Sequence, residues 1–223
     1  MNEYLDANKE HWDKVVPIHA KAVDYYDAEG FKSHRMSLHS IELEELGDVS
    51  GKSLLHLQCH FGLDTMSWTR PGATATGVDF SEEAISLARS LSRELGIGAM
   101  FVLPNIYGLP VALDEKYDIV FTSYGMLSWL PDLAQWAKVA VHFLRLGGTY
   151  YMAEMHLFLD VFDERESSAL KVHFSYFGGH PTRYEADGTY ADTGARVVTP
   201  TYQSEHSLGE VGNSLIGQDS ESS

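Results

Sequence analysis

The chain has 223 residues, 44% of them hydrophobic, which is enough for one folded domain with a sizeable core and argues against a disordered chain. Its 16 basic and 32 acidic residues give a formal net charge of −16, and such a surface repels nucleic-acid phosphates and anionic membranes. We therefore expect neither nucleic acid nor a membrane as a partner, although solubility alone also explains the charge.

The cysteine and histidine content bears on the cell compartment of the protein and on whether it holds a metal. Cys59 is the single cysteine, so no internal disulfide can form. With no signal-like start, the sequence predicts a cytoplasmic location. No apolar run approaches the roughly 20 residues that cross a bilayer. The 11 histidines include no HExxH motif and no cluster at zinc-ligand spacing, so we expect no metal site.

The first 47 residues are polar and aromatic, and helices are predicted over residues 2–16 and 37–46. Gly47 follows the second of these, where a glycine commonly ends a helix.

Short apolar runs that read as buried strands follow in the centre of the chain. They occupy residues 53–59, 73–80, 99–104, 117–124 and 149–155. Helical patterns separate them. A short helix is expected at 64–69, Ser81 caps a longer one that Gly96 closes, and another begins after Asp132 and is expected to end at Gly147-Gly148. Strands that alternate with amphipathic helices indicate right-handed βαβ units. Residues 48–155 are therefore predicted to form a Rossmann-like α/β core with a doubly wound, mostly parallel sheet.

From His156 the pattern changes to a stretch rich in tyrosine, phenylalanine and glycine. Turn signals at 186–188 and 192–194 favour an antiparallel meander. Ser207 and Glu210 form a capping box, so a helix is expected to start there. Residues 216–223 are predicted to be a polar tail.

Two features of the core point to ligand binding. The first strand-to-helix turn is Gln58-Cys59-His60-Phe61-Gly62, whose backbone N–H groups can hold an anionic group. Asp79 ends the second strand, about 20 residues later, where a carboxylate can accept two ribose hydroxyls. The alternative for Asp79 is an acid that stabilises the helix after it. Of the glycine fingerprint of dinucleotide-binding folds only Gly62 is present, which argues against NAD or FAD.

Four sequence blocks in this region are LLHLQCHFGLDT, TGVDFSEEAISLAR, YDIVFTSYGMLSWLPD and LRLGGTYYMAE. In this order and spacing they resemble the class I S-adenosylmethionine-dependent methyltransferases of small-molecule type. The departures lie in the first block, where His56 replaces the family's acid and Gln58 and His60 replace two glycines. The resemblance implies S-adenosylmethionine as the cofactor and a small-molecule methyl acceptor as the partner.

The resemblance also implies where the cofactor binds. Its methionine end is expected at the first turn, and its ribose and adenine after the second and third strands. Its reactive methyl group is expected after the fourth strand. A tryptophan of the first helix is expected to cover the cofactor. The residues so implied are Trp12, Gln58, Cys59, His60, Gly62, Asp79, Phe80, Ser81, Asn105, Ile106, Thr122, Ser123 and Tyr124. The competing role for Asn105 is that of a turn residue after Pro104.

The sulfonium of this cofactor already activates the methyl group, so a general base is optional. The candidates for one are His19, Tyr26, Tyr124 and His156. For each, the alternative is a structural role as a buried aromatic residue or a hydrogen-bonded histidine.

By the same resemblance, residues 1–47 form a helical lid over the cofactor, and residues 156–223 form an antiparallel cover, a helix start and the tail of a single domain. Aromatic covers suit a small, partly apolar acceptor, but a homodimer interface explains the same residues.

The family's terminal strand pair is expected to be missing. The sheet edge beside the fourth and fifth strands would then be open, or covered by a partner chain or by the meander.

The function predicted is methyl transfer from S-adenosylmethionine to a small molecule by in-line displacement. One alternative is a non-catalytic cofactor-binding or interaction module that retains the fold. A nucleotide- or NAD-binding oxidoreductase is disfavoured by the missing glycines.

Overall fold

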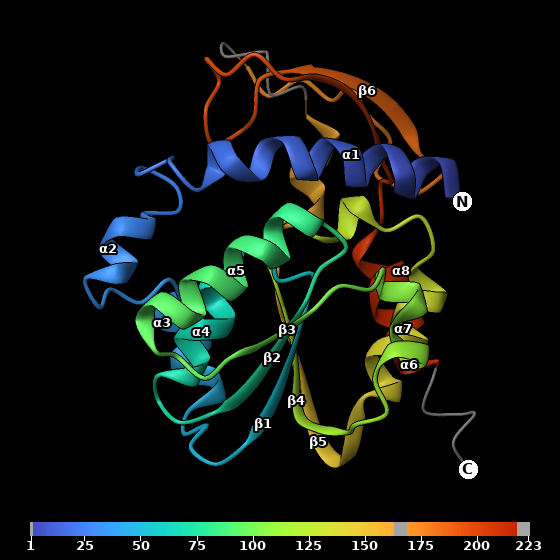
Figure 1. The fold of residues 1–223 in the computed structure, drawn as a ribbon. Coiled ribbons are helices and arrows are strands. Elements are labelled where there is room, and N and C mark those ends of the chain that lie inside the picture. The colour runs from blue at the N-terminus through green and yellow to red at the C-terminus, as the bar shows by residue number, and fades with distance from the viewer. Residues whose placement is uncertain (1, 163–168, 218–223) are drawn as a thin grey trace.

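The computed structural model describes residues 2–162 and 169–217. Its centre is a five-stranded sheet with the strand order β3-β2-β1-β4-β5 (Figure 1). Every neighbouring pair in it runs parallel. The strands are β1 (Ser53–Leu57), β2 (Thr74–Val78), β3 (Met100–Val102), β4 (Tyr117–Ser123) and β5 (Leu144–Ala153). This confirms the predicted Rossmann-like core. The strand order reverses between β1 and β4, which is the place where such sheets bind ligands.

Helices cover both faces of the sheet (Figure 1). One face carries α3, α4 and α5, and the other carries α6, α7 and α8. Their bounds are α3 (Ser40–Leu46), α4 (Leu63–Thr69), α5 (Glu82–Leu95), α6 (Leu109–Ala112), α7 (Leu133–His142) and α8 (Leu208–Ile216). Two large aromatic side chains that are fully buried, Trp68 on α4 and Trp136 on α7, pack into the two layers of core.

The helix starts predicted at Ser81 and Ser207 are confirmed, because each depends on a local hydrogen bond. The helix predicted from position 37 begins at Ser40 instead, where no side chain caps it. The Ser81 hydroxyl accepts from the Ala84 amide at the start of α5. Ser207 and Glu210 form both bonds of a capping box at the start of α8. The 216–223 tail lies outside the described residues from position 218 on.

The prediction that α7 ends at Gly147-Gly148 is wrong, because both glycines lie inside β5. Gly147 has φ +78°, and the register between β4 and β5 shifts at this point, so the pair forms a bulge. A Cβ atom on Gly148 would lie 2.9 Å from the carbonyl oxygen of Arg145. The glycines therefore serve a bent strand and not a helix end.

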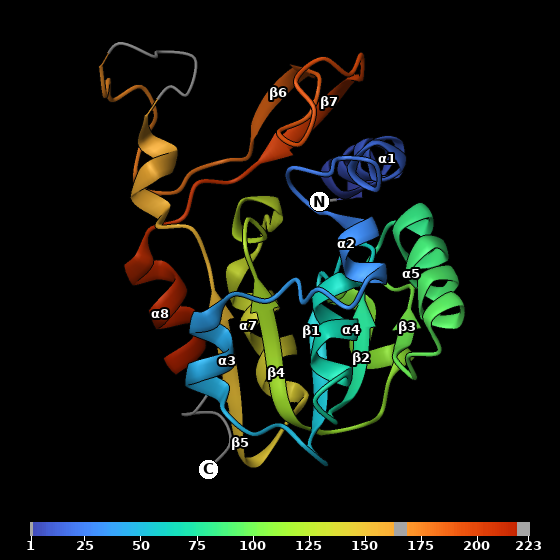
Figure 2. The ribbon, with the colours of Figure 1, turned by 90° about the vertical axis from the view of Figure 1, so that its left-hand side faces the viewer.

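Above the carboxyl ends of the strands lie the helix α1 (Asn2–His19) and the hairpin β6 (Thr182–Asp187) and β7 (Val198–Gln203) (Figure 2). The short helix α2 (Ala28–Lys32) follows α1. The buried Asn8 side chain of α1 holds β7, since its amide donates to the Tyr202 carbonyl and its oxygen accepts from the Tyr202 N–H, each at 2.8 Å. The predicted antiparallel cover is therefore a two-stranded sheet that packs on α1.

The β6–β7 hairpin forms a sheet of its own above the main sheet and does not pair with β5 (Figure 2). The hairpin is therefore not the cover of that edge. Among the described residues, β5 has β4 as its only strand neighbour, and the sheet has no terminal antiparallel pair. No described helix is long and apolar enough to cross a membrane.

Candidate functional site

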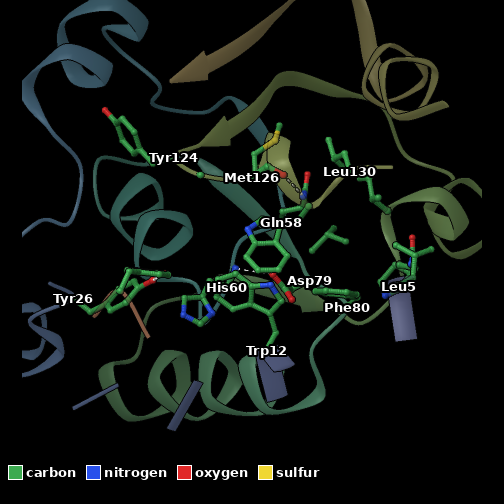
Figure 3. Close-up of a pocket in the computed structure, with 17 residues that line it drawn as sticks. Leu5, Trp12, Tyr26, Gln58, His60, Asp79, Phe80, Tyr124, Met126 and Leu130 are labelled. Carbon is green, nitrogen blue, oxygen red and sulfur yellow. Dashed lines mark hydrogen bonds between the residues drawn. The ribbon is translucent and has the colours of Figure 1, made fainter. Parts of the chain in front are cut away.

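A pocket lies where the strands of the sheet end, under α1 and the β6–β7 connection (Figure 3). Its volume is about 740 Å³ including the open mouth, within the usual size of small-molecule sites. Residues from six separate parts of the chain line it. They are Leu5, Trp12, Tyr26, Gln58, His60, Val78, Asp79, Phe80, Pro104, Asn105, Ile106, Tyr124, Gly125, Met126, Trp129, Leu130 and Tyr190.

Asp79 is the single carboxylate among these lining residues. One of its oxygens accepts from the His60 backbone N–H at 2.9 Å, and the other accepts from the Ser81 N–H at 2.9 Å. Burial raises the pKa of Asp79 to about 6, although these backbone hydrogen bonds oppose that shift. Because a carboxylate oxygen can accept more than one hydrogen bond, both oxygens retain capacity for hydroxyl donors.

The first turn has an unusual backbone. Gln58 has φ +57° and His60 has φ +51°, in the left-handed region that favours glycine. The sequence resemblance places glycines of the methyltransferase family at these two positions, and in this chain both residues adopt a conformation that glycine adopts readily. Both side chains line the pocket, and the buried Gln58 Oε1 has no hydrogen-bond partner among the described residues. The turn thus offers an amide oxygen and an imidazole to a ligand.

Cys59 and Gly62, expected at the cofactor, do not line the pocket. The Cys59 side chain is buried and lies over Gly77, where an added Cβ would be 2.8 Å from its sulfur. A Cβ on Gly62 would lie 2.3 Å from the Phe101 ring, and Gly62 has φ +80° at the start of α4. Their visible roles are packing and backbone conformation.

His19 and His60 form a hydrogen-bonded pair, with His19 Nδ1 and His60 Nε2 3.0 Å apart. Burial lowers the pKa of His19 to about 4 and also lowers that of His60, so both rings are uncharged near neutral pH. Trp12 packs edge-on against both imidazoles. The pair therefore connects α1 with the first turn as neutral groups.

The other end of the pocket is apolar except for Asn105. Phe80, Leu5 and Leu130 lie together at this end in Figure 3, away from Tyr26 and Tyr124. Asn105 Oδ1 accepts from the Tyr107 N–H at 3.0 Å, so this residue both caps a turn and lines the pocket. The two roles considered for Asn105 are compatible.

Three further predicted residues lie behind the pocket wall. Thr122 is buried and shares a 2.9 Å hydrogen bond with the Tyr150 hydroxyl. Ser123 donates to Asp64 at 3.0 Å and contacts His56 Nε2 at 3.2 Å. Ser81 caps α5. These three are not among the lining residues, so any part they play in binding acts through neighbours.

Tyr26, Tyr124 and Tyr190 surround what we call the acceptor end of the pocket. The Tyr26 hydroxyl hydrogen-bonds to that of Tyr190, so the segment after α1 meets the β6–β7 connection. Burial raises the pKa of each of these three hydroxyls. They are therefore neutral hydrogen-bonding groups near neutral pH. His156, the remaining candidate base, is exposed, caps a 3-10 turn and does not line the pocket.

Several site residues were not predicted from the sequence. Glu154, which follows β5, accepts from the backbone N–H groups of Gly125, Met126 and Leu127 and so fixes the loop after β4. Its place directly after a predicted strand is a pattern from which a role at the site could have been predicted. Five lining residues had no such local signal, because tertiary packing alone brings them to the pocket: Leu5, Met126, Trp129, Leu130 and Tyr190.

Comparisons with known proteins show what the chain is similar to in sequence and in fold. Residues 54–148 match the family model described as a methyltransferase domain. The ubiquinone biosynthesis O-methyltransferase of Serratia proteamaculans (strain 568) is 28% identical over 147 residues, covering 64% of this chain and 61% of the relative. The enzyme of the same name from Proteus mirabilis (strain HI4320) is 26% identical over 161 residues, covering 65% of each. The match therefore spans less than two thirds of these relatives.

Solved structures share the fold. A complex described as DhpI-SAH has a TM-score of 0.60 at 16% identity, covering 97% of this chain and 88% of that one. An S-adenosylmethionine-dependent methyltransferase from Mesorhizobium loti has a TM-score of 0.58 at 18% identity, covering 79% and 78%. Residues 54–148 are therefore similar to methyltransferase domains, and the chain shares the fold of solved S-adenosylmethionine-dependent methyltransferases.

Proposed function

We propose that this chain binds S-adenosylmethionine in the pocket and transfers its methyl group to a small molecule at the acceptor end. The observation that carries the proposal is the position of Asp79. A buried carboxylate ends β2 beside the strand-order reversal, and a single pocket runs from it to Tyr26 and Tyr124. The similarity to ubiquinone biosynthesis O-methyltransferases favours oxygen as the acceptor atom.

The residues divide the binding between them. Asp79 would accept from the two ribose hydroxyls, and Phe80, Asn105 and Ile106 would hold the adenine. Gln58 and His60 would contact the methionine end. When bound, the cofactor supplies a methyl group already activated by its sulfonium.

The remaining task of the protein is alignment. Transfer requires the acceptor atom to approach in line with the breaking C–S bond, from a site that excludes water. Trp12, Tyr26 and Tyr190 cover the pocket from α1, from the segment after it and from the hairpin. Since the pKa values of Tyr26 and Tyr124 are raised, these hydroxyls suit positioning better than proton removal. His19 is buried against His60 and is a poor candidate for a base.

Titration calorimetry with S-adenosylmethionine, S-adenosylhomocysteine and NAD tests this proposal. Heat with both sulfur ligands and none with NAD is expected. Binding of NAD alone would favour an oxidoreductase. Binding of the sulfur ligands with no product from any acceptor would favour the non-catalytic module. The reason to consider that alternative is the presence of side chains at Gln58 and His60, where the resembled family has glycines. A cytoplasmic location and a homodimer stay predictions.

A further inference from the structure

We propose that the acceptor end of this pocket selects an aromatic acceptor that carries a cationic amine, and that it excludes acceptors that carry a carboxylate or a phosphate. The inference rests on the proposed function, because it names the acceptor class of the same site. It follows from the charges, the buried groups and the rings that surround Tyr26 and Tyr124.

The pocket has no cationic side chain to pair with an anion. No lysine or arginine is among the residues that line it in the described part of the chain. The His19 imidazole is buried and shares a hydrogen bond with the His60 imidazole, and burial lowers the pKa of both, so neither is a cation near neutral pH. The exposed His39 ring packs edge-on against Tyr124, on the outer side of the site. An anionic acceptor would therefore lose hydration without gaining a buried counterion, which is unfavourable.

Carboxylates lie behind both tyrosines of the acceptor end. Asp64 accepts from the Ser37 hydroxyl at 2.6 Å and from the Ser123 hydroxyl at 3.0 Å, so its position is fixed. Its partner Ser123 directly precedes Tyr124 in the chain, so Asp64 lies beside the acceptor end. Burial is the main cause of the raised pKa of Tyr26 and of Tyr124, and the charge of Asp64 adds to both. A cation that enters between these two rings would be attracted to the same charge.

Glu42 on α3 adds a second carboxylate on the Tyr124 side. It is fully buried, and neither of its oxygens has a hydrogen-bond partner among the described residues. The Tyr124 hydroxyl is near enough for Glu42 to raise its pKa. A buried carboxyl without a donor is costly to keep. A ligand cation at the acceptor end would be attracted to this carboxyl group and would offset part of that cost.

Aromatic rings complete the arrangement. Tyr26, Tyr190 and Trp12 line the pocket, and Tyr25 packs on Tyr190 with ring centroids 5.0 Å apart. Figure 3 shows Tyr26 and Tyr124 on the same side of the residues drawn, with Trp12 between Tyr26 and Phe80. Faces of tyrosine and tryptophan attract cations, and they also stack on an aromatic acceptor.

Three catechols that differ in one substituent test the inference. Their rings carry an aminoethyl group, an ethyl group or a carboxymethyl group, so they are cationic, neutral and anionic. Calorimetry on the protein saturated with S-adenosylhomocysteine should give the tightest binding for the cation, by about tenfold or more over the anion. Equal affinities, a preference for the anion, or binding of none of the three would overturn the inference. Failure to bind S-adenosylhomocysteine is a separate result that refutes the proposed function.

Two variants attribute the preference to the carboxylates. Glu42→Gln should reduce the ratio of cation to anion affinity by about threefold or more, because it removes a charge of the acceptor end. Glu44→Gln is the matched control, an exposed position on the same helix, and should leave the ratio unchanged. Asp64→Asn provides a second route should Glu42→Gln fail to fold, and thermal unfolding of each variant checks this. Equal ratios of cation to anion affinity in the wild type, in Glu42→Gln and in Asp64→Asn would contradict the assignment of the preference to these two carboxylates.

Discussion

The position of Asp79 can be predicted from the sequence, and its surroundings in the fold provide a way to test its role. Its place at the end of a strand was evident from the sequence, because an apolar run followed by an acid and a capping serine is a local pattern. Its two backbone hydrogen bonds and its burial depend on the fold. Burial changes its protonation, so binding at this carboxylate should depend on pH.

We predict that affinity for S-adenosylhomocysteine falls as the pH is lowered through about 6. The pKa of Asp79 is raised to about 6, so the carboxylate form that accepts strongly from hydroxyls is lost below that pH. His19, with its pKa lowered to about 4, stays neutral in this window. Calorimetry from pH 5 to pH 8 measures the effect.

Asp79→Asn should weaken binding about tenfold at pH 8 and remove the pH dependence, since charge-assisted hydrogen bonds are worth about 1.5–3 kcal/mol. Asp48→Asn, at an exposed position outside the pocket, serves as the control. An unchanged pH profile in Asp79→Asn would count against the ribose assignment.

Gly62 separates a packing role from a binding role. Gly62→Ala places a Cβ 2.3 Å from the Phe101 ring at φ +80°. The strained backbone and the overpacking together should cost about 2–4 kcal/mol of unfolding free energy. Gly96→Ala, at φ +65° with open space around it, should cost only about 1–2 kcal/mol. Denaturant unfolding compares the two, and equal losses would show that the Phe101 contact is unimportant.

At the scale of elements, the sequence predicted the strands and the capped helices well, because each depends on neighbouring residues. The end of α7 was missed, since a glycine pair that bends a strand looks the same in sequence as one that ends a helix. The lining residues Tyr190 and Trp129 were missed for a different reason. Each reaches the pocket through contacts between elements far apart in the chain, and no local pattern records these contacts.

The contact between α1 and β7 should control access to the pocket. Asn8→Ala removes two hydrogen bonds and leaves backbone groups of Tyr202 without partners, at a cost of about 2–3 kcal/mol. We expect faster amide exchange in residues 198–203 and weaker binding of S-adenosylhomocysteine, because α1 and the hairpin carry Trp12 and Tyr190. Glu10→Ala, at an exposed position of the same helix, is the control. Unchanged exchange in Asn8→Ala would show that other contacts hold the hairpin.

At the scale of the whole molecule, the edge strand β5 is the main liability. Its Leu146 side chain is fully exposed, and no described strand pairs with its outer edge. We predict concentration-dependent self-association through this edge, reduced in Leu146→Lys because a charge opposes edge-to-edge pairing. Sedimentation velocity measures it. A wild type that stays monomeric at every concentration, or an unaffected variant, would refute the prediction.

We propose that one pocket, from Asp79 to the acceptor end, binds the cofactor. A crystal structure of the chain with S-adenosylhomocysteine is the decisive measurement. We expect density in this pocket, with the ribose hydroxyls on the Asp79 carboxylate and the homocysteine near Gln58 and His60. Density for the ligand elsewhere on the chain, or a ribose placed away from Asp79, would contradict it.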